Sequence, residues 1–431
     1  MPYKTFQPPT EWTPPDTFPV KKLLDADEIA IDLETRDPNL KEKGPGYIRG
    51  DGEIVGISVA CDGYADYFPF AHETGFNFPK KKVLEFTKDI VSGNSDKIFH
   101  NAMYDVGWLR QAGVDVKGRV IDTMVVAPLI NENMYWYTLN ALGIEYLQEG
   151  KSEAELRQAA EEWGIDPKAE MWRLPSAYVG TYATQDAALT LKLWNHFKIL
   201  LEEQNLWNIF ELETNLFPVL FNMKTTGVRV DLDRAAQLKK QLIVEQKKIT
   251  REVVKESGVK EVRVWAAKSV AKVFDACKIP YNQTAKGNPS FTKAFLANQE
   301  HPVAKKIMKI RELDKAHSTF IDTIVKHAHN GRIHADIRQL KGETGGTVTG
   351  RLSMSNPNLQ QVPARDKELG PLIRSLFLPE EGQKWCSADF SQQEPRILTH
   401  FAYRSKYEGV DPVAEAFIAG EADFHQQVAE L

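Results

Sequence analysis

Acidic residues stand at three places in the first half of the chain, in patterns that could bring carboxylates together. Asp32 and Glu34 alternate with apolar residues, so both side chains would project from one face of a strand. Tyr182 precedes Asp186 by four residues in a helical pattern, which places the phenol and the carboxylate on one helix face. Asp105 lies at the start of another predicted helix.

Converging carboxylates suit the metal-dependent cleavage of phosphodiesters. In that reaction one divalent cation activates water and a second stabilises the leaving oxygen. Carboxylate oxygens favour Mg²⁺ or Mn²⁺, which keep some water and take a substrate phosphate as a further ligand. A phenol beside such a carboxylate can orient the attacking water. Each pattern by itself is more often a solvated surface feature, so the prediction depends on all three occurring in order.

The sequence around these residues predicts a sheet with helices. A strictly alternating strand is followed by an antiparallel meander with a turn at Asp62-Gly63, and then by a fourth strand that leads into a helix. Strands first and interleaved helices later predict an α/β or α+β domain that ends near residue 200. The predicted strands are residues 28–34, 54–60, 67–70 and 97–100, and the predicted helices are 102–111 and 177–201.

Length and composition indicate a globular protein of several domains. The chain has 431 residues, of which 42% are hydrophobic and 26% charged. No apolar run is long enough to span a membrane and no signal pattern begins the chain, so we expect no membrane partner. The three cysteines are too few and too far apart for a disulfide framework. Prolines in residues 1–20 favour an extended leader, with regular structure beginning near Asp27.

The middle of the chain is basic and helical. Between Lys224 and Lys272 there are 13 Lys or Arg against 6 Asp or Glu, a local charge of +7 in a chain of net charge −5. A basic arm suits a phosphate backbone, although a solvated lysine-rich helix gives the same pattern. Residues 303–326 predict a further helix. The apolar positions of the long amphipathic helix are Leu238, Leu242, Ile249 and Val253.

The three acidic segments resemble the exonuclease motifs of the DEDDy group, the proofreading domains of DNA polymerases and their relatives. The matching segments are residues 31–35, 101–105 and 182–186. The resemblance implies a ribonuclease H-like fold with a two-metal site. The residues it implies are the metal ligands Asp32, Glu34, Asp105 and Asp186, the water-positioning Tyr182 and the DNA-binding Asn101. RNA-trimming enzymes similar to ribonuclease D share these motifs.

A second set of residues resembles the family A DNA polymerases. Residues 349–353, Thr-Gly-Arg-Leu-Ser, and residues 357–363, which begin Pro-Asn-Leu-Gln, match a motif of that family almost residue for residue. Glycine and small polar residues there let the backbone approach nucleic acid closely. The resemblance implies that Arg351, Asn358 and Gln360 bind DNA.

Residues 389–396, Asp-Phe-Ser-Gln-Gln-Glu-Pro-Arg, are similar to motif A of the same family and follow an apolar, strand-like approach with Trp385. By that resemblance Asp389 would bind both polymerase metals, Glu394 would exclude a ribose 2′-hydroxyl, and Gln392 would bind the nucleotide. Three positions depart from the family motif, so we expect altered local packing. These positions are Phe390, Gln393 and Pro395. We expect nucleotide binding to be kept, because Asp389 and Glu394 are in place.

His425, in an Asp-Phe-His segment, resembles the family histidine that approaches the incoming triphosphate. The sequence ends six residues later and contains no fingers motif and no second palm aspartate. We therefore expect no autonomous DNA synthesis, because phosphoryl transfer needs that positioning and charge. Either the sequence is part of a longer product, or a separate C-terminal polymerase fragment completes the palm and fingers.

The sequence thus predicts an α/β, ribonuclease H-like exonuclease domain, a helical thumb and the N-terminal part of an α+β polymerase palm. The expected boundaries are residues 1–26 for the leader, 27–205 for the exonuclease, 206–330 for the thumb and 331–431 for the palm. Expected ligands are two Mg²⁺ or Mn²⁺ ions, a single-stranded DNA 3′ end, a primer-template duplex and, in the complete enzyme, dNTP. The family implies the cytoplasm of a bacterium or a phage-infected host. The alternatives are an RNA-trimming exonuclease similar to ribonuclease D and a non-catalytic DNA-binding subunit.

Overall fold

The computed structural model describes residues 10–343, 345–364, 366–420, 423 and 426. The chain divides into two compact units, Met1–Leu378 and Pro379–Leu431, which are treated separately below. Within the described residues, no helix is long and apolar enough to cross a membrane.

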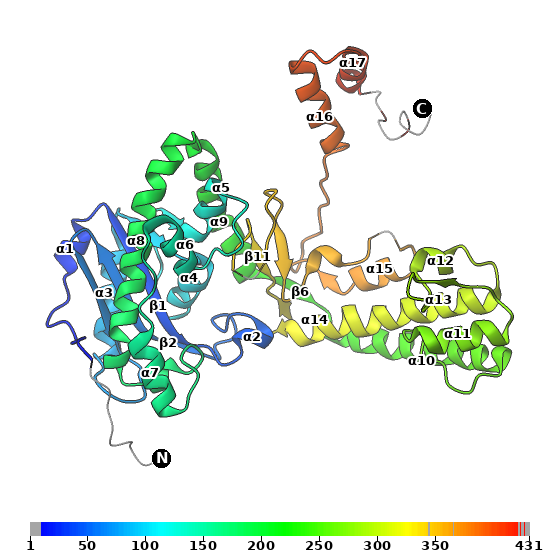
Figure 1. The fold of residues 1–431 in the computed structure, drawn as a ribbon, viewed down its shortest axis with the longest axis horizontal. Coiled ribbons are helices and arrows are strands. Elements are labelled where there is room, and N and C mark those ends of the chain that lie inside the picture. The colour runs from blue at the N-terminus through cyan, green and yellow to red at the C-terminus, as the bar shows by residue number, and fades with distance from the viewer. Residues whose placement is uncertain (1–9, 344, 365, 421–422, 424–425, 427–431) are drawn as a thin grey trace. The chain divides into compact units, whose positions relative to one another are not determined.

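A mixed sheet of five strands forms the first part of the larger unit (Figure 1). Its order is β3-β2-β1-β4-β5, in which β2 is antiparallel to its neighbours β1 and β3, and β4 and β5 run parallel to β1. The predicted meander and fourth strand are therefore confirmed. The strands are β1 (Glu28–Arg36), β2 (Glu53–Cys61), β3 (Tyr64–Pro69), β4 (Asp96–Phe99) and β5 (Val120–Asp122).

Helices cover both faces of this sheet because β1 is apolar on both sides. Ile29, Ile31 and Leu33 are buried in one core with α3 (Lys80–Ser92) and α4 (Ala102–Gln111). Ala30 faces the other way, into a core with α8 (Gly180–Glu203). Figure 1 shows α8 lying across β1 and β2, which it contacts. The smaller helices here are α2 (Leu40–Lys43), α5 (Thr123–Ile130), α6 (Leu139–Leu147), α7 (Ala154–Trp163) and the 3-10 turns η1 (Met171–Arg173) and η2 (Ser176–Tyr178).

The expectation of an extended, unpacked leader is wrong for residues 10–26. Helix α1 (Val20–Leu24) forms there, and its Leu23 is buried. The ring of Phe18 stacks on Phe68 of β3 with centroids 5.2 Å apart. Trp12 packs against Tyr67 of the same strand. Large apolar side chains spaced among the prolines fix this segment to the sheet, so proline content alone predicted its packing poorly.

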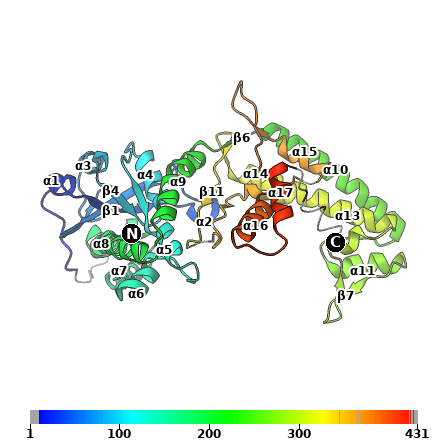
Figure 2. The same ribbon diagram turned by 90° about the horizontal axis from the view of Figure 1, so that it is seen from above.

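A second region of the larger unit is mainly helical. Leu238, Leu242 and Val253 of α10 (Leu232–Ser257) are buried, which confirms the long amphipathic helix. Helix α10 packs along α13 (Pro302–Lys315), as Figure 2 shows. Asp231 caps α10 by accepting a hydrogen bond from the backbone N–H of Arg234. The other elements are α9 (Trp207–Thr226), α11 (Ala267–Ala276), β7 (Asn282–Gln283), β8 (Pro289–Ser290), α12 (Lys293–Ala297), the π-helical turn η3 (Ala316–Ile321) and α14 (Asp322–His327).

Short antiparallel strands complete the larger unit. One sheet has the order β13-β6-β10-β9, and β11 pairs separately with β12. The strands are β6 (Val228–Val230), β9 (Ala328–His329), β10 (Arg332–Ile333), β11 (Asp336–Arg338), β12 (Ser353–Ser355) and β13 (Phe377–Leu378), with η4 (Leu359–Gln361) and α15 (Leu369–Arg374) between them.

In its described residues, the smaller unit contains the helices α16 (Gln393–Arg404) and α17 (Asp411–Ala419). The Arg396 guanidinium donates a hydrogen bond to the Phe417 carbonyl, which joins the two helices. The strand-like approach expected around Trp385 is wrong, because residues 383–390 have no regular structure. A strand needs a neighbour for its backbone hydrogen bonds, and the described part of this unit contains no strand that could pair with it.

Candidate active site

Strand β1 and helix α8 bring together carboxylates that lie far apart in the sequence. Asp32 and Glu34 project from the same face of β1 as Ala30, the face that α8 covers. Asp186 comes from the first half of α8, one turn after Tyr182. One oxygen from each of Asp32, Glu34 and Asp186 lies within 4.8 Å of the others.

Asp105 lies near this cluster without joining it. Its side chain is buried in the first turn of α4. Burial, followed by the charge of Asp32, raises its pKa well above the usual value. Among the described residues, the carboxylates grouped at metal-ligand distances are nevertheless only those of Asp32, Glu34 and Asp186.

Asp122 holds the turn that carries Asn101. No pattern in the sequence had singled out this residue. Asn101 has a left-handed backbone, with φ of 75°, and precedes α4. The backbone N–H groups of Asn101 and Ala102 donate to the Asp122 carboxylate at 2.9 and 2.8 Å. The same carboxylate caps α5 through the N–H of Met124. Asp122 therefore orients the start of α4, and with it Asp105.

The carboxylates raise one another's pKa values. Burial, followed by the charge of Asp186, raises the pKa of Asp32 to about 8. Burial and the charges of Asp32 and Asp186 raise the pKa of Glu34 well above its usual value. Like charges this close cannot all ionise without a compensating cation. The cluster at neutral pH therefore binds protons or positive charge.

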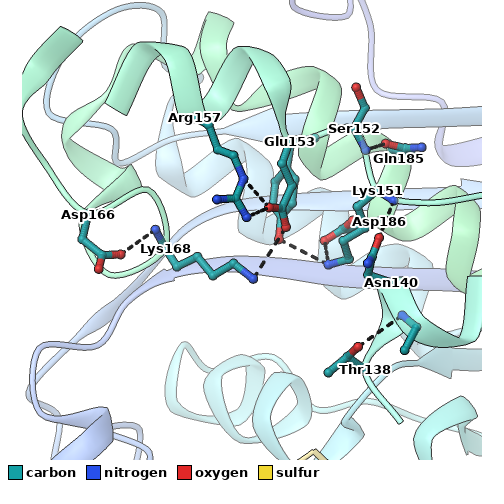
Figure 3. Close-up of polar contacts among 12 residues, drawn as sticks. Thr138, Asn140, Lys151, Ser152, Glu153, Arg157, Asp166, Lys168, Gln185 and Asp186 are labelled. Atoms are coloured by element: carbon teal, nitrogen blue, oxygen red, sulfur yellow. Dashed lines mark hydrogen bonds and ion pairs between the residues drawn. The ribbon is translucent and has the colours of Figure 1, made fainter. Parts of the chain in front are cut away.

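Lys151 supplies one such charge and is the second residue that the sequence did not reveal. Its ammonium group donates to Asp186 Oδ2 at 2.5 Å and to the Tyr182 hydroxyl at 3.3 Å. Figure 3 shows Lys151 pointing at Asp186 from the loop between α6 and α7. Burial alone would lower the pKa of Lys151, but Asp186 and Asp32 raise it, so the ammonium stays charged.

Two side chains fix the loop that carries Lys151. Asn140 Oδ1 accepts the backbone N–H of Lys151 at 2.8 Å. Gln185 of α8 accepts the N–H of Ser152 (Figure 3). It also donates to the Gly150 carbonyl. A lysine in a polar loop gives no periodic signal of burial, so nothing in the sequence singled it out.

The donor set fits a divalent metal ion. All the converging ligands are hard carboxylate oxygens. Asp186 Oδ1 is buried, and no described residue donates a hydrogen bond to it. Asp186 can therefore offer Oδ1 to a cation while Oδ2 binds Lys151. Burial raises the pKa of Tyr182 well above its usual value, so its hydroxyl remains protonated beside the cluster.

The predicted DNA-binding residues of the later motif lie in one exposed turn. Asn358 Oδ1 accepts the backbone N–H of Gln360, and Gln360 Nε2 donates to the Leu352 carbonyl at 2.9 Å. Arg351 is exposed, and its carbonyl accepts a hydrogen bond from Thr347. These contacts shape the turn and leave the DNA-binding roles as predictions.

The predicted polymerase residues lie in the smaller unit. Asp389 is exposed and belongs to no acidic group found among the described residues. Gln392 has φ of 53° and precedes α16, and Glu394 lies in the first turn of that helix. His425 lies outside the described residues. The roles of these four residues stay predictions.

Comparisons with known proteins agree with the arrangement of the two regions. The family model described as 3'-5' exonuclease matches residues 19–202, and the one described as DNA polymerase family A matches residues 232–431. The chain is 36% identical over 414 residues to the DNA-directed DNA polymerase of Pseudomonas phage M6, covering 92% of this chain and 62% of that protein. It is 31% identical over 439 residues to DNA polymerase DpoZ of Salmonella phage PMBT28, covering 95% and 66%. The chain thus spans less than two thirds of the length of these relatives.

A solved structure shares the fold. It is the POL domain of Pol1 from M. smegmatis in complex with DNA primer-template and dNTP. The TM-score is 0.69 at 21% identity, and the match covers 95% of this chain and 65% of that one. The likeness extends across both regions described above.

Proposed function

We propose, since this chain belongs to DNA polymerase family A and carries that family's 3′-5′ exonuclease segment, that it removes nucleotides from DNA 3′ ends by metal-dependent hydrolysis. The observation that carries this proposal is the convergence of Asp32, Glu34 and Asp186 within 4.8 Å, with a buried, unpartnered Asp186 Oδ1. Water adds to the phosphorus of the terminal phosphodiester, the P–O3′ bond breaks, and a nucleoside monophosphate leaves.

The cations that best suit this site are two Mg²⁺ or Mn²⁺ ions, held by Asp32, Glu34 and Asp186 with Asp105 beside them. When bound, they would activate water and stabilise the leaving oxygen. The Tyr182 hydroxyl, which stays protonated, would orient the water. The Lys151 ammonium would keep Asp186 ionised and in place.

DNA-directed DNA synthesis is the second proposed activity, and we propose it for the whole protein. The match over residues 232–431 and the names of the phage relatives support it. We assign residues 27–205 to the exonuclease, 206–330 to a thumb that grips primer-template duplex, and 331–431 to the palm. Asp389 would bind metal. Arg351, Asn358 and Gln360 would bind DNA, and Gln392, Glu394 and His425 would bind dNTP.

Resection of 5′-labelled single-stranded DNA in Mg²⁺ tests the first proposal. We expect the chain to shorten the DNA stepwise from its 3′ end, and EDTA to stop the reaction. An Asp32→Ala, Glu34→Ala double variant should lose at least about 100-fold in rate, because the cation site is gone. Asp62→Asn, at the β2–β3 turn, is the matched acidic control and should retain activity. Equal resection by the double variant and the parent would eliminate the assignment.

An RNA strand of the same sequence distinguishes the remaining alternative. Preference for RNA over DNA would favour an RNA-trimming enzyme. Primer extension with dNTP measures the second activity separately, and an Asp389→Asn variant reports whether that residue contributes.

A further inference from the structure

Two large aromatic side chains are exposed side by side on the loop between α5 and α6. Tyr135 is 77% exposed and Trp136 is 56% exposed. Their ring centroids are 4.7 Å apart, and the rings are nearly perpendicular, at 85°. This edge-to-face arrangement leaves ring faces open to solvent. Exposed adjacent aromatic rings are suited to a ligand that also has flat apolar faces.

The backbone under these two rings is firmly held. The next residue, Tyr137, is fully buried, and its hydroxyl donates to the Asn131 carbonyl at 2.7 Å. Lys341 donates to the Met134 carbonyl at 2.8 Å, and its ammonium lies 5.6 Å from the Tyr137 ring centre. Thr138 then caps α6. The loop is therefore fixed on both sides of the pair, so little ordering would accompany binding.

The loop borders the acidic cluster. The Tyr137 backbone lies against the imidazole of His100, the residue before Asn101 and α4. Asn140, five residues after Tyr135, binds the backbone of Lys151, whose ammonium reaches Asp186. Lys341 adds a positive charge that suits a phosphate backbone.

We propose that Tyr135 and Trp136 form a stacking platform for unpaired bases of single-stranded DNA whose 3′ end occupies the acidic cluster. The proposal rests on the exonuclease function proposed above and deepens it by naming the surface that selects a single strand. Every base has a π-face, so such stacking is tolerant of sequence. Bases paired within a duplex are already stacked and cannot use the rings, which favours a frayed end over a paired one.

Binding in EDTA tests the platform without catalysis. A 5′-fluorescein oligo(dT) strand is titrated with the full chain, and anisotropy is recorded. Trp136→Leu and Tyr135→Leu should each weaken binding about 10-fold, because leucine keeps apolar area but has no ring to stack. Trp136→Phe and Tyr135→Phe keep a ring and should stay within about 3-fold of the parent. Equal binding by the leucine and phenylalanine variants would overturn the proposal.

Two controls separate stacking from other causes. A base-free strand of the same length should bind the parent and the leucine variants equally, because it has nothing to stack. Phe76→Leu removes another exposed ring, 48% exposed and in edge contact with Phe78 of the same segment, and should leave oligo(dT) binding unchanged. If the base-free strand also loses affinity for the leucine variants, the rings do not act through bases and the proposal fails.

Hydrolysis in Mg²⁺ distinguishes this inference from the function on which it rests. The ratio of kcat/KM on an eight-nucleotide strand to that on a dinucleotide should fall about 10-fold in the leucine variants, because a dinucleotide offers few bases to the platform. A ratio equal to the parent's contradicts the platform while leaving the exonuclease intact. Ring-dependent binding with no hydrolysis by any variant would instead remove the proposed function and keep the platform.

Discussion

Lys151 and Asp186 form a buried ion pair, and a bound metal ion could also neutralise the charge of Asp186. Asp186 can bind a metal ion through Oδ1, whereas Lys151 has Asp186 and Tyr182 as its hydrogen-bond acceptors. Replacing Lys151 with Met should lower the free energy of unfolding of the metal-free protein by about 1–3 kcal/mol, because Asp186 loses its partner in a buried site. Saturating Mn²⁺ should recover most of that loss. Urea unfolding in EDTA and in Mn²⁺ measures both effects.

Lys192→Met is the matched control for Lys151→Met. Lys192 also joins α8 to the loop after α6, through Glu149, but that pair is solvent-exposed. We expect the change to cost no more than about 1 kcal/mol in either buffer. A loss from Lys151→Met that is just as large in Mn²⁺ as in EDTA would mean that Lys151 acts by packing rather than by charge.

Asp32 should give the metal-free protein an unusual pH dependence. Its pKa is raised from 3.8 to about 8 by burial and by Asp186. The folded state therefore keeps a proton that the unfolded chain releases, and the associated stability is lost as pH rises from roughly 4 to 8. In EDTA the free energy of unfolding should fall by at most about 1.4 kcal/mol per pH unit for this proton. Thermal unfolding of Asp32→Asn should show a shallower decline, and a decline as steep as the parent's would contradict this assignment.

At the scale of elements, β1 and α8 were predictable because their periodic patterns reflect what each face contacts. Ile29 and Ile31 meet one layer of helices and Ala30 meets the other, so the alternation read from the sequence places Asp32 correctly. Helical spacing did the same for Tyr182 and Asp186. Local periodicity thus predicted the faces from which Asp32, Glu34 and Asp186 project, whereas their convergence was implied by the resemblance to the exonuclease motifs.

The elements that escaped prediction depend on contacts distant in the sequence. The position of Lys151 is set by side chains of α6 and α8, and a loop lysine carries no periodic signal. Phe18 and Leu23 pack on a sheet and a helix formed by later residues, which the proline content concealed. The place of Asp105 outside the tight cluster depends on how Asp122 orients α4.

The packed leader makes a prediction at this scale. Leu23 of α1 is fully buried, whereas the next residue, Leu24, is 45% exposed. Leu23→Ala should lower the free energy of unfolding by about 2–4 kcal/mol, because it leaves a cavity against the core below the sheet. Leu24→Ala should change it by no more than about 0.5 kcal/mol. Similar losses in the two variants, measured by urea unfolding, would show that α1 does not pack as described.

At the scale of the larger unit, polar contacts join residues 339–341 to α9 and to the loop after α5, both of which come much earlier in the sequence. Gln339 donates to the carboxylate and the carbonyl of Glu213 in α9. Lys341 reaches the Met134 carbonyl in the loop after α5. These contacts join residues that are more than a hundred positions apart in the sequence, and no local pattern predicts them. They place residues 339–341 beside the loop that carries the proposed stacking platform.

Lys224 of α9 and Asp336 of β11 form a further polar link and give the last prediction. Lys224 Nζ contacts Asp336 Oδ1 at 2.6 Å, with side chains only 5% and 15% exposed, and lies 5.4 Å from the Tyr47 ring centre. Asn356 donates to the other oxygen of Asp336. Lys224→Met should cost about 3–5 kcal/mol, because a buried carboxylate loses its partner. Adding Asp336→Asn should then cost little more, because it removes the carboxylate charge that Lys224→Met leaves unpaired.

A double-mutant cycle in calorimetric unfolding measures this coupling between Lys224 and Asp336 directly. The exposed pair Lys239–Asp322, with side chains 37% and 44% exposed, supplies the comparison and should couple by no more than about 1 kcal/mol. Coupling of the buried pair above that value means that the charge interaction itself ties β11 to α9, and through Tyr47 to the loop after β1. If the two single losses instead add within about 0.5 kcal/mol, the ion pair does not join these segments, and the Gln339–Glu213 contact is left as the principal polar link.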